Sequence, residues 1–172
     1  SPHDVLVRAT EVLAQHTDIA PPAQQFAYSL DAATSMAATD GTPTAVVEYR
    51  FSSLYYGTWT WDEASELWLR VQQGKADLDS NGNQLTASNV VAIRVNVVND
   101  GGVPKTVLEG SGQAWVSSGG GTILATWSKA SATEPIRLVD ANGVTIRLAA
   151  GNTWFELIPP NGSVSLIPPT AP

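Results

Sequence analysis

The sequence predicts a mainly β domain: an antiparallel β-sandwich or barrel-like roll of about ten strands, with one short N-terminal helix. From residue 44 onward, apolar and polar residues alternate with a period of two, as in strands that bury one face. Glycine-containing turns separate these short segments, which is typical of antiparallel all-β folds. The sequence shows no alternation of strand-like and helix-like segments, the pattern that would favour a parallel sheet.

The clearest strand pattern lies in residues 91–98, where every second residue is β-branched and apolar. This pattern predicts a strand with one buried face. Residues 99–102, Asn-Asp-Gly-Gly, tolerate positive φ, and residues 103–108 run back, so the two segments are expected to form a hairpin. Further short strands are expected at residues 26–30, 44–52, 58–61, 67–72, 113–117, 122–128, 136–139, 144–148 and 154–158.

A helical period occurs in one segment near the N-terminus. Its apolar positions fall on one face of a helix of about three turns: Val5, Leu6, Ala9, Val12 and Leu13. Asp4 is a candidate N-cap, and Pro21-Pro22 ends the segment. Because so short a helix needs tertiary packing, its apolar face requires another surface to cover it.

These patterns divide the chain into three parts. Residues 1–25 form a helix and linker. Residues 26–158 form the antiparallel β domain. Residues 159–172 form a proline-rich tail, in which we expect an edge strand before a frayed end.

Composition excludes several classes of function. The 172 residues carry a net charge of −7, and the nine basic residues are scattered, which disfavours nucleic acid as a partner. The absence of cysteine excludes a disulfide framework, a thiolate metal site and a cysteine nucleophile. No apolar run approaches the roughly 20 residues of a membrane span, and the N-terminus has no signal-peptide pattern.

An aromatic cluster with one nearby arginine is the main candidate for ligand binding. Its members are Tyr55, Tyr56, Trp59, Trp61, Trp68 and Arg70. Aromatic rows can stack on sugar rings or bases, and an arginine can hold a carboxylate or phosphate. If Trp61 pairs with Leu67, the tryptophans face a leucine-lined core. If Trp61 pairs with Trp68 and Trp59 with Arg70, the residues form an amphipathic platform. The sequence leaves both registers open.

Oxygen-bearing side chains at alternate positions suggest a candidate cation site. Asp77, Asp79 and Asn81, followed by Gly82, match the first half of a calcium loop. The twelfth position, which should supply a bidentate glutamate, is Ser88. The alternative is a tight turn built on Asn81-Gly82. We expect no cofactor beyond a weak calcium ion.

Catalytic motifs are weak, and we expect no catalytic residues. The only histidines are His3 and His16, and their spacing does not suit a metal pair. Carboxylates in a hairpin loop, Asp62, Glu63 and Glu66, suit acid–base work on a glycan, or simply a solvated turn. A further carboxylate, Glu156, shares a strand face with Trp154. This pattern is typical of a buried tryptophan whose indole N–H donates to a carboxylate, which is a structural contact of the core.

Two stretches resemble a known family. The first runs from Trp61-Asp62 through Trp68-Leu69-Arg70, Gly74-Lys75 and Asp79 to the sequence QLTASNVV at residues 84–91. The second comprises residues 121–129, 136–143 and 151–157. Their ordered spacings resemble the YerB-like lipoprotein family, a domain of unknown function (DUF3048), mainly its C-terminal domain.

The N-terminal Pro2-His3-Asp4 is similar to the end of the family's preceding domain, where Asn is expected at position 4. The resemblance therefore implies that residues 1–25 are the remnant of that N-terminal domain. Asp77 stands where this family is expected to have a histidine, which weakens any role for a histidine there.

The resemblance implies an envelope-facing lipoprotein of Gram-positive-type bacteria, extracytoplasmic and attached to the membrane through a lipid anchor that this chain lacks. The β framework, the acidic charge and the missing catalytic motifs favour a non-catalytic binding or scaffold domain, whose partner we expect to be an envelope protein or a cell-wall glycan. The alternative is a carboxylate-dependent hydrolase or lyase of cell-wall glycans, acting through residues 62–79.

Overall fold

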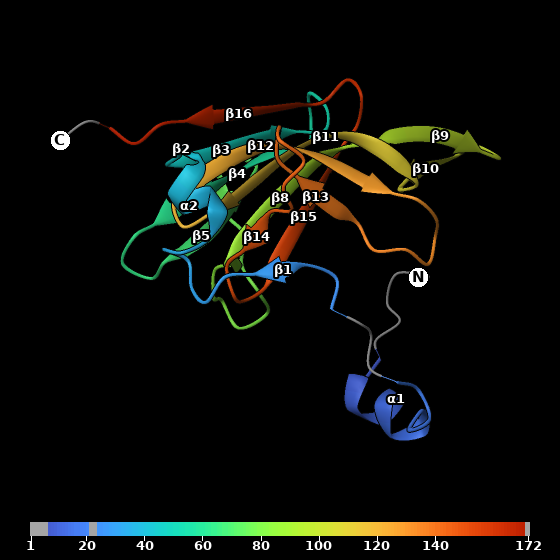
Figure 1. The fold of residues 1–172 in the computed structure, drawn as a ribbon. Coiled ribbons are helices and arrows are strands. Elements are labelled where there is room, and N and C mark those ends of the chain that lie inside the picture. Colours follow the sequence, from blue (N-terminus) through green and yellow to red (C-terminus); the bar gives the residue numbers. More distant parts are fainter. Residues whose placement is uncertain (1–6, 21–23, 171–172) are drawn as a thin grey trace.

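The computed structural model describes residues 7–20 and 24–170, and within them the chain is mainly β, as predicted (Figure 1). Two six-stranded sheets pack face to face. In the described residues the sheets stay open, so the fold is a sandwich rather than a closed barrel. No helix in this part of the chain is long and apolar enough to cross a membrane.

The first sheet, which we call the aromatic sheet, has the strand order β16-β3-β4-β5-β6, and β7 also pairs with β5. Its pairs are antiparallel. Its strands are β3 (Val46–Arg50), β4 (Tyr56–Asp62), β5 (Leu67–Gln72), β6 (Lys75–Ala76), β7 (Thr86–Ala87) and β16 (Ser163–Ile167). The edge position of β16 confirms the edge strand expected in the C-terminal tail.

The second sheet, which we call the central sheet, has the order β13-β12-β11-β8-β15, and β2 also pairs with β12. Its strands are β2 (Thr42–Pro43), β8 (Asn89–Arg94), β11 (Gly110–Ser118), β12 (Gly121–Lys129), β13 (Arg137–Val139) and β15 (Thr153–Ile158). The strands expected at residues 113–117 and 122–128 are present as β11 and β12. They pair as a hairpin, with positive φ at Gly119 and Gly120.

One strand pair in the central sheet departs from the expected antiparallel arrangement. β15 runs parallel to β8, with Trp154 opposite Val90 and Glu156 opposite Ala92. The connection between these strands contains β9 to β14 and no helix. The sandwich prediction therefore holds, with this local exception. The parallel pairing could not be predicted from the sequence, because the two strands are far apart along the chain.

A third layer covers the outer side of the central sheet. It consists of α2 (Met36–Asp40), β1 (Ala27–Tyr28) and β14 (Arg147–Leu148), and β1 pairs in parallel with β14. The sequence predicted the strand near residue 27 but missed α2. This helix is only five residues long, so it has too few turns to show a period; it is capped by the Ser35 hydroxyl, which accepts from the Ala38 N–H.

β8 lies between two hydrophobic cores. Val91 and Ile93 face the core under α2, whereas Val90 and Ala92 face the core between the two sheets. The expectation that residues 91–98 form one strand with a single buried face is therefore wrong. The strand ends at Arg94, and both of its faces are covered, which explains the continuous apolar run in its sequence.

The predicted hairpin after β8 forms a separate two-stranded ribbon. It consists of β9 (Asn96–Asp100) and β10 (Val103–Val107), with positive φ at Gly101 and Gly102. The ribbon extends beyond the end of the sandwich (Figure 1).

The N-terminal helix α1 spans Ala9–Gln15 and buries none of its residues. It lies apart from the sheets (Figure 1). Val12 and Leu13 are exposed, so the described residues do not cover its apolar face. Asp4, Val5 and Leu6, on which the predicted start of the helix depends, lie outside the described residues, as does Pro2-His3-Asp4.

Candidate functional site

The register of the β4–β5 hairpin places Trp59 opposite Arg70 and Trp61 opposite Trp68. This is the second of the two registers that the sequence left open. The face formed by these residues points inward, however, because it packs against β15 and β8. Trp59 and Trp68 are 0% exposed and Arg70 is 8% exposed.

The six residues of the predicted ligand platform therefore do not form one exposed surface. Trp59, Trp68 and Arg70 are buried, and Trp61 packs against the inter-sheet core. Tyr55, which precedes β4, and Tyr56, the first residue of β4, are exposed. The period of two indicated which residues share a face, but it could not indicate that a second sheet covers that face.

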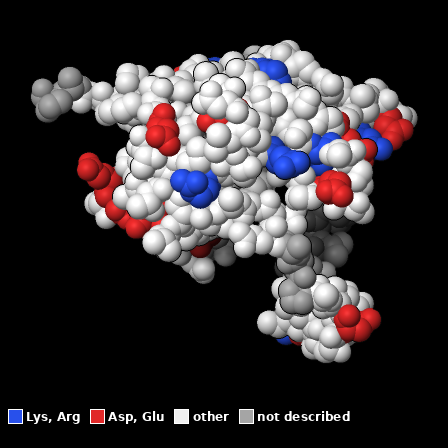
Figure 2. Space-filling view, viewed as in Figure 1, with Lys and Arg blue, Asp and Glu red and all other residues white. Residues whose placement is uncertain are grey.

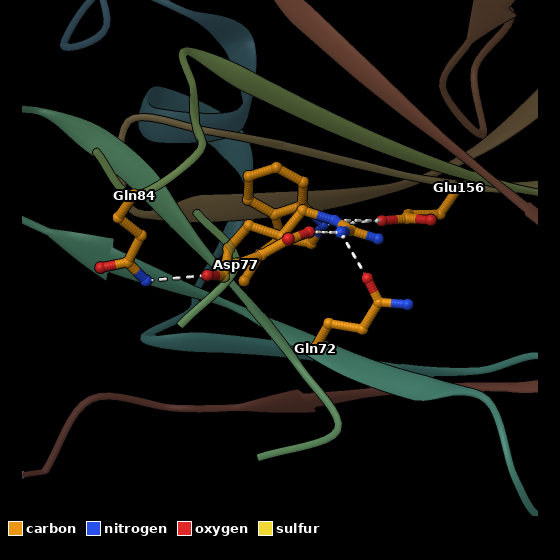
Figure 3. A network of polar contacts seen from close by, with 6 residues as sticks. Gln72, Asp77, Gln84 and Glu156 are labelled. Atoms are coloured by element: carbon orange, nitrogen blue, oxygen red, sulfur yellow. Dashed lines mark hydrogen bonds and ion pairs between the residues drawn. The ribbon is translucent and has the colours of Figure 1, made fainter. Parts of the chain in front are cut away.

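The buried Arg70 is the centre of a polar network, whose other members Gln72, Asp77, Gln84 and Glu156 are labelled in Figure 3. Its Nη1 donates to Gln72 Oε1 at 3.0 Å and forms an ion pair with the Asp77 carboxylate. Its Nε lies 3.6 Å from Glu156 Oε1. The backbone carbonyl of Arg70 accepts from Gln84 Nε2 at 2.8 Å. Two carboxylates, Glu156 on β15 and Asp77 in the segment that follows β6, thus compensate one buried cation.

Aromatic rings surround the guanidinium of Arg70. Its central carbon lies 4.7 Å from the ring centre of Trp154, 5.8 Å from that of Trp59 and 5.9 Å from that of Tyr49. Cation–π attraction is stronger in such a desolvated position than at a surface. The aromatic residues therefore act on Arg70 from within the core and are not presented to solvent as a platform.

Glu156 accepts a 2.9 Å hydrogen bond from the indole N–H of Trp59. Burial raises the pKa of the Glu156 carboxyl, and the Trp59 hydrogen bond and the charge of Arg70 oppose this effect. The predicted hydrogen bond from a tryptophan to the buried Glu156 is thus present, but its donor is Trp59 on β4. Trp154, the neighbour on β15, instead packs against Trp59 with ring centres 5.4 Å apart.

Tyr49 completes the buried cluster. Burial, together with the negative charge of Glu156, raises the pKa of its phenol to about 12, so the group stays protonated. Within the described residues, Tyr49 Oη and Arg70 Nε are buried without a hydrogen-bond partner. Gly57 leaves room for the phenol, because a Cβ at that position would collide with Tyr49 Oη. Each charged group of the network faces another protein group, which favours a structural role.

The candidate cation residues do not converge on one point. The Asp77 carboxylate pairs with Arg70. Asp79 Oδ1 accepts the backbone N–H groups of Asn81 and Asn83, at 2.8 and 2.9 Å. No group of three His, Cys, Asp or Glu side chains that could hold a metal ion occurs in the part of the chain that the structure describes.

A second turn in the chain has the same hydrogen bonds as the Asp79 turn. Asp140 Oδ1 accepts the N–H groups of Asn142 and Val144, and Gly143 has positive φ, as Gly82 has in the first turn. Both sequences read Asp-x-Asn-Gly. The Asp79 segment therefore has the geometry of a tight turn, which was the alternative interpretation of its sequence.

The carboxylates considered for catalysis lie in the β4–β5 turn. Asp62 accepts from the N–H and hydroxyl of Ser65 in its own turn, at 3.0 and 2.5 Å. Glu63 and Glu66 are exposed, and Glu66 has a positive φ of 54°. His16 is exposed beyond α1, and His3 lies outside the described residues.

The outer face of the aromatic sheet carries an open pocket that the sequence analysis did not identify. It has a volume of about 270 Å³. Its lining residues come from β3, β4, β5 and the turn that follows: Glu48, Tyr49, Arg50, Tyr56, Gly57, Thr58, Val71 and Gly74. Tyr56 was a predicted ligand residue, but Glu48 and Arg50 were missed. The polar positions of the alternating 44–52 segment were the available signal.

The fold and these sites define a class: an open β-sandwich domain with an arginine–carboxylate network around the buried Arg70 and a small open pocket on one outer face. Residues 47–155 match the model of the family described as "Protein of unknown function (DUF3048) C-terminal domain". The chain belongs to this family, which confirms the resemblance seen in the sequence. None of the curated proteins matches the sequence significantly.

The fold is similar to that of a solved structure, the crystal structure of the YerB protein from Bacillus subtilis. The TM-score is 0.67 with 15% sequence identity, and the match covers 91% of this chain and 52% of that one. This chain therefore spans about half the length of the matched protein. At this identity the likeness concerns the fold alone.

Proposed function

We propose that this chain is a non-catalytic binding domain that recognises a cell-wall glycan. The pocket on the outer face of the aromatic sheet is the observation that carries the proposal. It presents an aromatic ring (Tyr56), a guanidinium (Arg50) and a carboxylate (Glu48) to solvent. Sugar-binding sites need an apolar surface for ring C–H groups and polar atoms for the hydroxyls, and this pocket offers both.

The absence of a catalytic role is part of the proposal, and the positions of the carboxylates support it. Glu156 is buried beside Arg70, the half-buried Asp77 pairs with Arg70, and Asp62 is occupied by its own turn. A glycosidase needs two carboxylates that flank one glycosidic bond. No observation favours the alternative of a hydrolase or lyase.

The cellular setting that we propose is the cell envelope, with attachment through a lipid anchor in the full-length protein. This rests on the family resemblance alone. On the face shown in Figure 2, basic groups are interspersed with acidic ones. Such a surface, with the net charge of −7, supports a partner other than nucleic acid.

The proposal is tested by nuclear magnetic resonance titration of the ¹⁵N-labelled chain with soluble peptidoglycan fragments. We expect saturable shifts at the backbone amides of the pocket residues Arg50, Tyr56 and Thr58, and no new product by mass spectrometry. If no fragment shifts these amides, or if the chain converts a fragment to product, the proposal is wrong. If an envelope protein shifts these amides and no peptidoglycan fragment does, the chain has a scaffold role and does not recognise a glycan.

A further inference from the structure

We infer that the outer pocket takes an acidic sugar, whose carboxylate is bound by Arg50 and whose hydroxyls are bound by Glu48 and Thr58. This inference rests on the proposed function and specifies its ligand. It follows from the pairing of the strands, from the partners of the charged side chains and from the sign of the two charges in the pocket.

Strand pairing builds the pocket from two rows of side chains. Glu48 pairs with Thr58, which in turn pairs with Val71 on β5. In the next outward-facing row, Arg50 pairs with Tyr56. Outward-facing rows are two residues apart along each strand, so a flat ring can lie between them. The volume of about 270 Å³ is slightly below the range for drug-sized ligands, and thus suits one sugar ring.

Arg50 is positioned to receive an anion. Its guanidinium carbon lies 4.7 Å from the ring centre of Tyr56, so the ring restrains the side chain. Among the described residues, Arg50 makes no ion pair and no side-chain hydrogen bond. By contrast, Arg70 is compensated by two carboxylates, and Arg94 donates to the carbonyls of Pro159, Pro160 and Gly162.

Glu48 decides which kind of anion fits. It faces the same side of β3 as Arg50, is exposed, and forms no ion pair with Arg50. A compact, highly charged anion such as phosphate would be repelled by this carboxylate. A ligand with a single carboxylate at one end and neutral hydroxyls at the other satisfies both residues, because an ionised Glu48 only accepts hydrogen bonds. Val71, in the same row as Glu48 and Thr58, lines the pocket and offers an apolar contact for the ring C–H groups.

The test compares sugars that differ in charge. The ¹⁵N-labelled chain is titrated with glucuronic acid and N-acetylmuramic acid, with glucose and N-acetylglucosamine as neutral counterparts, and with glycerol phosphate. A charge-assisted hydrogen bond from Arg50 predicts binding of the acids about tenfold tighter than of the neutral sugars. The shifts should centre on Arg50, Tyr56 and Thr58.

Two variants and a control assign the roles. Arg50→Gln should abolish the preference for acids, whereas Arg147→Gln, an exposed arginine on β14 that does not line the pocket, should leave it unchanged. Glu48→Gln should weaken sugar binding and improve binding of glycerol phosphate. An unchanged amide spectrum outside the pocket verifies that each variant is folded.

The outcomes separate the two proposals. Equal affinity for acidic and neutral sugars at the pocket, or acid binding that survives Arg50→Gln, overturns the acidic-sugar inference and leaves glycan recognition standing. If glycerol phosphate binds the unmodified chain more tightly than the sugar acids, the role given to Glu48 is wrong and the inference fails. If no sugar and no peptidoglycan fragment shifts the pocket amides, both proposals fall.

Discussion

The indole nitrogen of Trp59 on β4 and Oε1 of Glu156 on β15 are 2.9 Å apart and join the two sheets of the sandwich. The two residues are separated by 97 positions in the sequence, and both are buried. Because Glu156 also lies beside the Arg70 guanidinium, a single carboxylate connects the hairpin of one sheet to the parallel strand of the other.

Trp59→Phe should destabilise the domain, because it leaves Glu156 Oε1 without its donor. The loss of a hydrogen bond to a buried charged acceptor predicts a decrease of about 1–3 kcal/mol in the free energy of unfolding, measured by urea denaturation. Trp154→Phe is the matched control, since it keeps the hydrogen bond and an aromatic ring beside Arg70. Its effect should be smaller.

Hydrogen exchange of the Trp59 indole N–H is a second measurement, which reports on the hydrogen bond to Glu156 directly. The Trp59 indole proton should exchange slowly with solvent in the unmodified chain and in Trp154→Phe, and faster in Glu156→Ala. Fast exchange of the Trp59 indole in the unmodified chain would show that the bond to Glu156 is absent in solution.

Arg70→Met should be more destabilising than any surface substitution. It removes the cation and leaves Glu156 buried beside no opposite charge, which typically costs about 3–5 kcal/mol. Adding Glu156→Gln to Arg70→Met should recover part of this loss, since glutamine still accepts from Trp59. The double-mutant cycle is measured by chemical denaturation, and additive effects of the two changes would contradict a direct coupling between these side chains.

Strand alternation predicted most of the sandwich, because a period of two and glycine turns depend on short-range sequence only. It also identified Trp154 and Glu156 as residues of one inward face. It could not predict the donor to Glu156, since Trp59 lies 97 positions away, on a strand of the other sheet. The parallel pairing of β15 with β8 was missed because these two strands are also far apart in the sequence.

The candidate site shows the same limit more sharply. The correct register of Trp59 and Arg70 was one of two that the sequence allowed, yet that register alone suggested an exposed platform. Burial of that face depends on β15, whose contact with the hairpin involves no local signal. Arg50 was overlooked because its partner Tyr56 lies across a turn, in the neighbouring strand.

The stability of the domain should respond to pH through Glu156. Burial raises the pKa of this carboxyl above its ordinary value of 4.5. The folded state therefore holds the proton more tightly than the unfolded state, so this contribution is fully present below pH 4.5 and is lost as the pH rises through the raised pKa. Asp31 and Asp79 act in the opposite sense, because hydrogen bonds from Thr34 and Asn83 lower their pKa values.

Comparison with Glu156→Gln isolates the effect of Glu156. The difference in unfolding free energy, unmodified chain minus variant, should decrease as the pH rises above 4.5, since only the unmodified chain carries the titrating group. Urea denaturation at several pH values measures it. The aspartates are present in both proteins and cancel. A difference that stays constant or increases with pH would mean that Arg70 outweighs the burial of Glu156.

The two Asp-x-Asn-Gly turns provide an internal comparison for the candidate calcium site. If the Asp79 segment is only a turn, Asp79→Ala and Asp140→Ala should each remove two hydrogen bonds from backbone N–H groups and lower the melting temperature by similar amounts, with or without calcium. A cation bound by Asp77, Asp79 and Asn81 would make the first variant alone sensitive to calcium. It would also make the melting temperature of the unmodified chain fall when a chelator is added, because a ligand that binds only the folded state stabilises it. Since Asp77 is already paired with Arg70, we expect the chelator to have no effect.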